Sequence, residues 1–437
     1  MVKSVMLFGN SEFRRNLVLA ALGLVVLAMM VIVFLAVKEL RARDRNRLMA
    51  KAYASEKAGN DTEAITEFTT VVEQYPDTES AWFGRGFARL KTKDYTGAVD
   101  DFSRALEIDP KDLGALDGRG AAKYQNEDMS GAISDFDRVL ELKPDEISAL
   151  NERGLAKEKN GDSAGAMADI EHALEVNPQS VASIDNHGLL LVHRGDLTGA
   201  IADYTQTLKL DPKHTLALRG RGIARAYNGD IKGAMADLTA AISQDPKNVA
   251  GYLERASAQE IGGDYASAMA DLDLAMKIDA KNSSTFFHQG LVDRAIGSRA
   301  AAIKEFQEAA KLGYAYGVVW SAAVQMEDGH RDLAAREVTD GLSQFSPAKA
   351  AKWPGPIAQY LKGSLTQEQL LAEANKSTDK VEKLGRLCEV WFFMGLSQKA
   401  DRNFAEAKKS FEQSVATERK SYIEYNEARV ELGQMGQ

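Results

Sequence analysis

The sequence predicts an all-α protein: a superhelical solenoid of helix-turn-helix units that follows a transmembrane helix near the N-terminus. Two observations lead to this prediction. A stretch of 21 residues without a charged side chain covers positions 17–37. After it, proline, alanine and glycine each recur at a spacing of 34 residues. A repeat period in this range is typical of solenoids, in which each unit packs only on its neighbours.

The apolar stretch at 17–37 is long enough to cross a membrane, because 21 helical residues span the hydrocarbon core of about 30 Å. The alternative is a cleaved signal peptide, whose apolar core is shorter, about 7–15 residues, and ends in a small-residue cleavage site. We therefore expect an uncleaved anchor at 17–37, an N-terminal tail at 1–16 and a basic juxtamembrane segment at 38–44. Positive-inside bias places the body that follows in the cytoplasm.

Charge is spread unevenly along the 437 residues. The net charge is −9, although residues 1–51 hold nine Lys and Arg against three acids. The acidic body argues against nucleic acid as a partner, because such a surface needs cations to replace counterions. The single cysteine, Cys388, excludes an intrachain disulfide framework and a cysteine-cluster metal site.

The repeat itself is carried by fixed columns of residues. Six of the nine prolines lie 34 residues apart, from Pro76 to Pro246, and an alanine column runs without a gap from Ala64 to Ala302. In residues 79–112, small and bulky residues at spacings of three and four predict two helices, which Pro110 ends. The period predicts eight such helix pairs over residues 45–314.

These small, bulky and proline columns resemble the tetratricopeptide repeat family over residues 45–314. Beyond them we expect a degenerate repeat at 315–345, an irregular helical insertion at 346–387, a further repeat at 388–421, and a capping helix with a tail at 422–437. Within the insertion, Thr366 and Gln369 fit the capping box of a helix start.

The segment from Trp353 to Gly395 also resembles, over a shorter length, the C-terminal part of NlpI-type bacterial envelope proteins. Those proteins are extracytoplasmic tetratricopeptide adaptors. This resemblance favours a periplasmic location for the repeats, opposite to the positive-inside bias, and the cytoplasmic side stays open.

Two polar columns keep the same period, and we predict that they form a ladder of ion pairs within or between repeats. The alternative is that the arginines bind a ligand. The first column holds Arg85, Arg119, Arg153, Arg221 and Arg255, with His187 in place of one arginine. The second holds Glu67, Asp101, Asp135, Asp169, Asp203, Asp237, Asp271 and Glu305.

Motifs of catalysis are absent from the sequence. It contains no P-loop, no G-x-S-x-G and no H-E-x-x-H, and its six histidines are scattered. Cys388 is predicted to be a buried, inert thiol at the start of a helix, because no basic partner is evident. We therefore predict no enzymatic activity, no cofactor and no metal.

In the tetratricopeptide family the first helix of each pair lines a concave face that typically binds an extended peptide or a helix. The resemblance therefore places a partner-binding groove on the first helices. Its predicted apolar patch is Phe83, Phe87, Leu90 and Tyr124, followed by Asn151, Leu155, Asp185, Leu189, Arg219 and Ile223. The alternative is that some of these side chains pack against neighbouring repeats or the capping helices.

These expectations combine into a membrane-anchored adaptor or scaffold that binds protein or peptide partners through its groove. The alternative function is a self-assembling scaffold that forms a membrane-associated oligomer. Neither function involves nucleic acid or a small-molecule substrate. Partner binding in the groove requires an inner wall that the C-terminal part of the chain does not fill.

Overall fold

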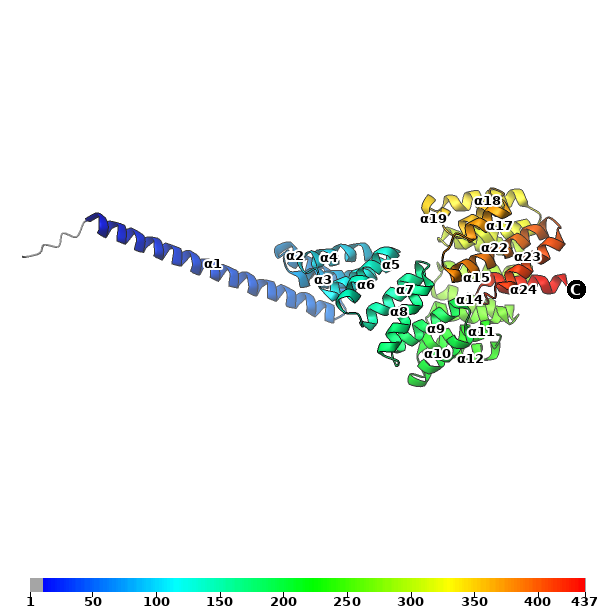
Figure 1. The fold of residues 1–437 in the computed structure, drawn as a ribbon, viewed down its shortest axis with the longest axis horizontal. Helices are drawn as coiled ribbons and strands as arrows, with labels where there is room; N and C mark the ends of the chain where they lie inside the picture. The colour runs from blue at the N-terminus through cyan, green and yellow to red at the C-terminus, as the bar shows by residue number, and fades with distance from the viewer. Residues whose placement is uncertain (1–10, 437) are drawn as a thin grey trace, which may run out of the picture. The chain divides into compact units, whose positions relative to one another are not determined.

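A computed structural model of the chain describes residues 11–436, with side chains from residue 15 onward. Within that range the chain forms 24 α-helices and no strand (Figure 1). The chain folds as two compact units, Met1–Leu142 and Lys143–Gln437, which we call unit 1 and unit 2. The all-α prediction is confirmed.

Unit 1 begins with one continuous helix, drawn as the long blue rod in Figure 1. Much of the predicted tail at 1–16 lies outside the described residues, and from Ser11 the chain is already helical. The segment at 38–44 is part of the same helix, because residues 38–57 contain neither glycine nor proline to end it. The helices are α1 (Ser11–Lys57), α2 (Asp61–Gln74), α3 (Glu79–Lys91), α4 (Tyr95–Ile108), α5 (Leu113–Gln125) and α6 (Met129–Leu142).

Three helix pairs form unit 1: the end of α1 with α2, α3 with α4, and α5 with α6. The glycines of the first helices leave room for the phenylalanines of the preceding pair. A Cβ atom at Gly84 would lie 2.4 Å from the ring of Phe68, and one at Gly118 would lie 2.6 Å from the ring of Phe102. Contacts this close exclude any side chain, so these two glycines set the distance between successive pairs.

Unit 2 continues with helix pairs and ends in a group of helices that breaks the repeat. The pairs are α7 (Ile147–Lys159) with α8 (Ser163–Val176), α9 (Val181–Arg194) with α10 (Leu197–Leu210), α11 (Thr215–Tyr227) with α12 (Ile231–Gln244), α13 (Val249–Ile261) with α14 (Tyr265–Ile278), α15 (Ser283–Ala295) with α16 (Arg299–Lys311), and α17 (Tyr316–Glu327) with α18 (Arg331–Ser343). The remaining helices are α19 (Pro347–Ala351), α20 (Gly355–Leu361), α21 (Gln367–Ala374), α22 (Lys380–Ala400), α23 (Phe404–Ala416) and α24 (Ile423–Met435).

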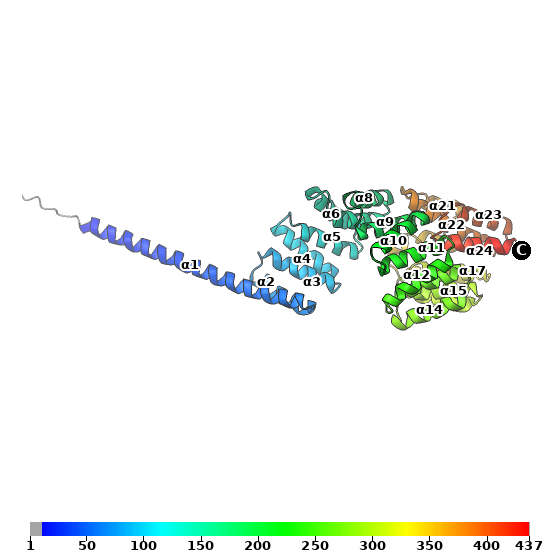
Figure 2. The same ribbon diagram turned by 90° about the horizontal axis from the view of Figure 1, so that it is seen from below.

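The C-terminal helices of unit 2 share one apolar core with α15 to α18. Trp320 lies at its centre, fully buried against Phe306, Phe392 and Phe393 at ring-centroid distances of 5.9, 5.5 and 5.4 Å. Figure 2 shows α24, in red, alongside α22 and α23. This continuous core joins the non-repetitive end of the chain to the last repeats.

Two local predictions for this region have different outcomes. The capping box is confirmed: Thr366 accepts from the Gln369 backbone, and the Gln369 side chain accepts from the Thr366 backbone at the start of α21. The prediction that a helix starts at Cys388 is wrong. Helix α22 starts at Lys380, because Asp379 caps it by accepting a hydrogen bond from the Glu382 backbone.

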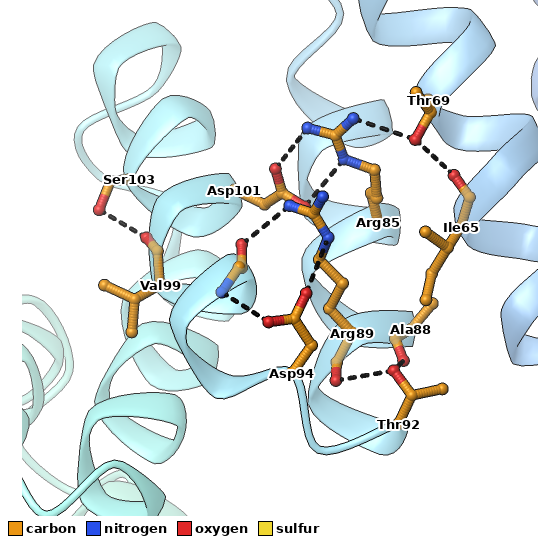
Figure 3. Close-up of polar contacts among 11 residues, drawn as sticks. Ile65, Thr69, Arg85, Ala88, Arg89, Thr92, Asp94, Val99, Asp101 and Ser103 are labelled. Carbon is orange, nitrogen blue, oxygen red and sulfur yellow. Dashed lines mark hydrogen bonds and ion pairs between the residues drawn. The ribbon is translucent and has the colours of Figure 1, made fainter.

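The predicted ladder of ion pairs is confirmed, and Figure 3 shows one rung. Arg85 donates from Nε and Nη2 to both oxygens of Asp101, at 2.9 and 2.6 Å. Its Nη1 donates to the hydroxyl of Thr69 on the preceding pair, at 3.1 Å. The arginine therefore ties its own pair together and links it to the pair before it.

The same bidentate contact recurs along the chain in Arg119–Asp135, Arg153–Asp169, Arg221–Asp237 and Arg255–Asp271. His187 takes the arginine position, and its Nδ1 lies 2.7 Å from a carboxylate oxygen of Asp203. The ladder is structural, because its charges are directed at one another rather than at a ligand.

Candidate functional site

The predicted apolar patch lies entirely in unit 1, on α3 and α5. Phe83 and Phe87 stack in parallel with ring centroids 6.5 Å apart, and Phe83 also packs edge-on against Phe102 at 5.7 Å. Phe83, Leu90 and Tyr124 are half-buried, whereas Phe87 keeps 37% of its surface exposed. We call Phe83, Phe87, Leu90 and Tyr124 the unit 1 patch.

Opposite charges border this patch along α3. The ammonium group of Lys91 lies over the ring of Phe87, 4.5 Å from its centroid. One helical turn before Phe83, Glu79 lies beside Asp112. Burial, and then the neighbouring Asp112, raise the pKa of Glu79 to about 7. The patch is thus apolar between an acidic and a basic end, which suits an amphipathic segment.

The three polar residues predicted for the groove lie in unit 2, where each is bound by its own chain. Asn151 is buried and donates to Ser183 at 2.9 Å. Asp185 accepts from Thr207 at 2.7 Å. Arg219 forms a two-pronged ion pair with Glu254 of the next repeat. The contacts of Asn151 and Arg219 hold successive first helices together, whereas that of Asp185 joins the two helices of one pair.

Leu189 and Ile223 line a cavity of about 570 Å³ whose far side is the C-terminal part of the chain. Tyr422, Ile423 and Glu424 belong to that far side. Leu155, the remaining predicted position, is half-buried on α7. The expectation of an inner wall free along its whole length is therefore wrong in unit 2. We call residues 379–435 the cover.

Polar contacts at two places fix the cover to the repeats of unit 2. Asp379 accepts a hydrogen bond from the backbone of Ser163, at 3.0 Å. Arg419 is only 3% exposed and donates to the last two carbonyls of α9, those of His193 and Arg194. A cation at the carboxyl end of a helix is stabilised by the helix dipole. Arg419 therefore fixes the cover to the end of α9.

A third contact is a buried cluster of charges around Arg294 on α15. Arg294 pairs with Glu327 of α17 and with Glu427 and Glu431 of the cover, and lies over the ring of Trp320. Burial lowers the pKa of Arg294, but the three carboxylates outweigh burial and raise it. Lys399 adds a second cation on Glu431. The cluster attaches α24 to the repeats.

Glu389 of the cover lies deep in unit 2. It accepts hydrogen bonds from Trp353 at 2.8 Å and from Tyr316 at 3.0 Å. Burial, and then the nearby Glu424, raise its pKa well above the usual range of a carboxyl group. Its contacts join the insertion, α17 and α22, so its role is to hold these elements together.

The repeated helix pairs match a known protein family. Family models described as tetratricopeptide repeat match residues 49–112, 147–180, 186–248 and 220–283. The chain is a tetratricopeptide repeat protein. Proteins of this family are in general protein-interaction scaffolds.

Solved structures of tetratricopeptide proteins resemble parts of this chain. One from Parabacteroides merdae is 20% identical, with 54% of this chain and 93% of that chain covered and a TM-score of 0.47. YrrB, described as having an unusual peptide-binding site, is 21% identical over 42% of this chain and 95% of its own, with a TM-score of 0.33. PilW, a type IV pilus biogenesis factor, is 18% identical over 44% and 90%, with a TM-score of 0.41. No curated protein matches the sequence.

A second cation on the ladder of this tetratricopeptide protein was not predicted from the sequence. Arg89 donates to the same carboxylate of Asp101 as Arg85 does, at 2.8 Å. Lys123, Lys157 and Arg225 contact Asp135, Asp169 and Asp237 in the same way. A signal was present, because a cation lies four residues after four of the five arginines of the column, Gln259 after Arg255 being the exception.

Cys388 is fully buried, with its sulfur 3.4 Å from the hydroxyl of Ser414. Burial raises the pKa of its thiol to about 12, so the thiol is protonated and unreactive at neutral pH. Among the described residues, no three histidine, cysteine or acidic side chains are grouped as they would be to hold a metal ion.

Proposed function

We propose that this protein is a membrane-anchored adaptor that holds a protein partner on the unit 1 patch. The observation that supports it most is the exposed, stacked Phe87 on a first helix of unit 1, where partners of this family bind. Large aromatic side chains supply much of the binding energy at protein interfaces. In unit 2 the corresponding wall is occupied by the cover.

The chemistry of the patch defines the kind of partner. Phe83 and Phe87 offer an apolar surface, with Glu79 at one end and Lys91 at the other. An extended or helical segment with one apolar face and a basic residue near Glu79 fits this arrangement. Such a segment would cover the exposed ring of Phe87 and place a cation opposite the carboxyl group of Glu79.

The anchor is assigned to the apolar half of α1. This is a single helix long and apolar enough to cross a membrane, and in this stretch its large side chains are exposed, from 44% at Val37 to 67% at Leu24. Buried core helices do not expose such a surface. We place the repeats on the extracytoplasmic side and assign no catalytic step to the protein.

A photo-crosslinking comparison tests the proposal. Phe87 and Leu189 occupy the same position of the repeat, three repeats apart, and each is 37% exposed. A photoreactive benzoylphenylalanine would replace each residue in turn in the full-length chain in its native membrane. We expect a crosslinked partner from position 87 and none from position 189, since that position faces the cover.

Three outcomes would argue against the adaptor. Equal crosslinking from both positions would remove the assignment to unit 1. A crosslinked product of twice the chain mass would favour the competing self-assembling scaffold. Release of the chain from membranes by alkaline carbonate would remove the anchor, and a reporter enzyme fused after Gln437 would determine which side the repeats occupy.

A further inference from the structure

A second cavity in unit 2, of about 410 Å³, lies between the inner wall and α24. Its walls come from α11, α13, α14 and α15 on one side and from the cover on the other. They are aromatic and aliphatic, with Tyr227, Tyr265, Ile261, Ile423 and Val430 among them. Two carboxyl groups, those of Glu260 and Glu427, and the guanidinium of Arg429 also line it.

Glu260 is the feature that the fold does not explain. Among the described residues, its side chain has no hydrogen bond and no ion pair. Burial, and then the nearby Glu427, raise its pKa to about 8, although the charge of Arg294 acts in the opposite direction. A buried carboxylate without a partner is costly, so a chain that places one against a cavity leaves room for a positive group beside it.

The charges around Glu260 come from two directions. On α24, Glu427 is already paired with Arg294 of α15, and Arg429 lies among the cavity residues. The buried cluster behind them holds three glutamates, Glu327, Glu427 and Glu431, against the cations of Arg294 and Lys399. Adding Glu260 and Arg429, which also line the cavity, gives four carboxyl groups against three cations.

His288 of α15 is another polar residue of the cavity lining. Its Nδ1 is buried without a hydrogen bond, and burial lowers the pKa of the ring to about 4. The imidazole is therefore neutral at pH 7 and does not supply the missing positive charge. The tyrosines are neutral as well, since burial raises the pKa of Tyr227 to about 12 and raises that of Tyr265.

From these contacts we infer that the cavity is a binding site for a compact organic cation, an ammonium or guanidinium group on a short aliphatic chain, which pairs with Glu260. The aromatic faces of Tyr227 and Tyr265 favour such a cation over a neutral molecule. Ile261 and Val430 accommodate its aliphatic part. A ligand bound here contacts both the inner wall and α24.

The experiment is isothermal titration of the full chain in detergent with pentylamine and with butylguanidinium. Pentanol and pentanoate, of the same length but neutral or negative, serve as controls. We expect saturable binding of the two cations only. Because Glu260, with its pKa of about 8, is mostly protonated at pH 7.5, binding of a cation should release protons. This release is seen as a heat that changes between phosphate and Tris buffer.

Glu260→Gln should weaken binding of the cations at least tenfold and abolish the proton release. The matched control is Glu175→Gln, which removes a carboxylate on α8, far from the cavity in sequence, and should leave binding unchanged. Val430→Trp is a second variant, which keeps Glu260 but fills the cavity from α24, and it should also prevent binding.

The inference is overturned if pentanol or pentanoate binds as well as pentylamine, or if Glu260→Gln leaves binding unchanged. It is also overturned if no saturable heat appears up to about 10 mM, which would reveal even millimolar affinity. A capped Ala-Lys-Ala peptide identifies the source of the cation. Its binding would indicate a polypeptide side chain, and its exclusion alongside pentylamine binding would indicate a free amine.

Discussion

Phe87 and Leu189 stand at the same repeat position, and their surroundings differ because of sequence elsewhere in the chain. In unit 1 the position carries an aromatic ring stacked on Phe83 and exposed to the surface. In unit 2 it faces a cavity that Tyr422 and Ile423 close from the other side. The repeat determines where an inner wall lies, but a segment outside the repeat decides whether that wall is free.

Removing Arg294 should have the largest effect on this contrast. Arg294→Met leaves Glu327, Glu427 and Glu431 without their shared cation inside unit 2, which should cost about 3–5 kcal/mol. Hydrogen exchange of the α24 amides should accelerate, and position 189 should become open to crosslinking. Arg104→Met is the control, because its pair with Glu107 is exposed and should contribute below about 1 kcal/mol. Equal exchange of α24 in both variants would contradict the role of Arg294.

The ladder offers a second comparison between the units. Asp101 is 1% exposed and held by Arg85 and Arg89, whereas Asp203 in unit 2 is 22% exposed and faces only His187 among the ladder positions. Asp101→Asn should therefore destabilise unit 1 by about 2–4 kcal/mol, and Asp203→Asn should cost about 1 kcal/mol or less. Urea unfolding, monitored by hydrogen exchange of the amides of each unit, measures the loss of stability in both variants. A larger loss of stability for Asp203→Asn than for Asp101→Asn would show that the second cation, Arg89, adds no stability.

Removing Arg419 should weaken the attachment of the cover less than removing Arg294 does. Arg419→Ala removes two charged hydrogen bonds to the end of α9, which should cost about 1.5–3 kcal/mol locally. Crosslinking from Leu189 should rise while that from Phe87 is unchanged. Lys409→Ala, on an exposed pair with Glu406 of α23, is the control. Should Leu189 stay unreactive, the Arg294 cluster and the hydrogen bond between Asp379 and Ser163 would suffice to hold the cover without Arg419.

The smallest expected effect concerns His187 and depends on pH. The hydrogen bond to Asp203 raises the pKa of His187 above 6.5. Its stabilisation is therefore complete below pH 6.5 and is lost as the pH rises through the raised pKa of the folded state. His187→Arg keeps the charge, so it should stabilise the protein by up to about 1 kcal/mol at pH 9 and by nearly nothing at pH 5. Thermal melts at both pH values measure the difference, and an equal gain at both would refute the assignment.

The periodic part of this protein could be predicted from its sequence, because two columns fix contacts between residues 16 positions apart, and these contacts recur every 34 residues. The pairing of the arginine column with the acid column was predicted in this way, and the structure shows that each pair lies within one repeat, as Arg85 and Asp101 do. The cover could not be, because its contacts join Ser163 to a residue 216 positions away and Arg194 to one 225 positions away. No period relates such partners.

The same limit explains the outcome for the candidate site. The columns correctly placed Phe87 on a first helix, but they could not show that Asn151, Asp185 and Arg219 are bound within the chain, because each partner is a residue outside the columns considered. The start of α22 could have been predicted from the sequence, since Asp379 with Glu382 three residues later is a typical helix start.

Helix α1 has a mechanical consequence for the proposed adaptor. The same rod that carries the apolar stretch supplies the first helix of the first repeat, so no flexible joint separates them. At 1.5 Å per residue, Arg45 lies only about 12 Å along the axis beyond Val37. A partner bound to unit 1 would therefore be held at a fixed height above the lipid headgroups. It would lack the rotational freedom that a flexible linker would give it.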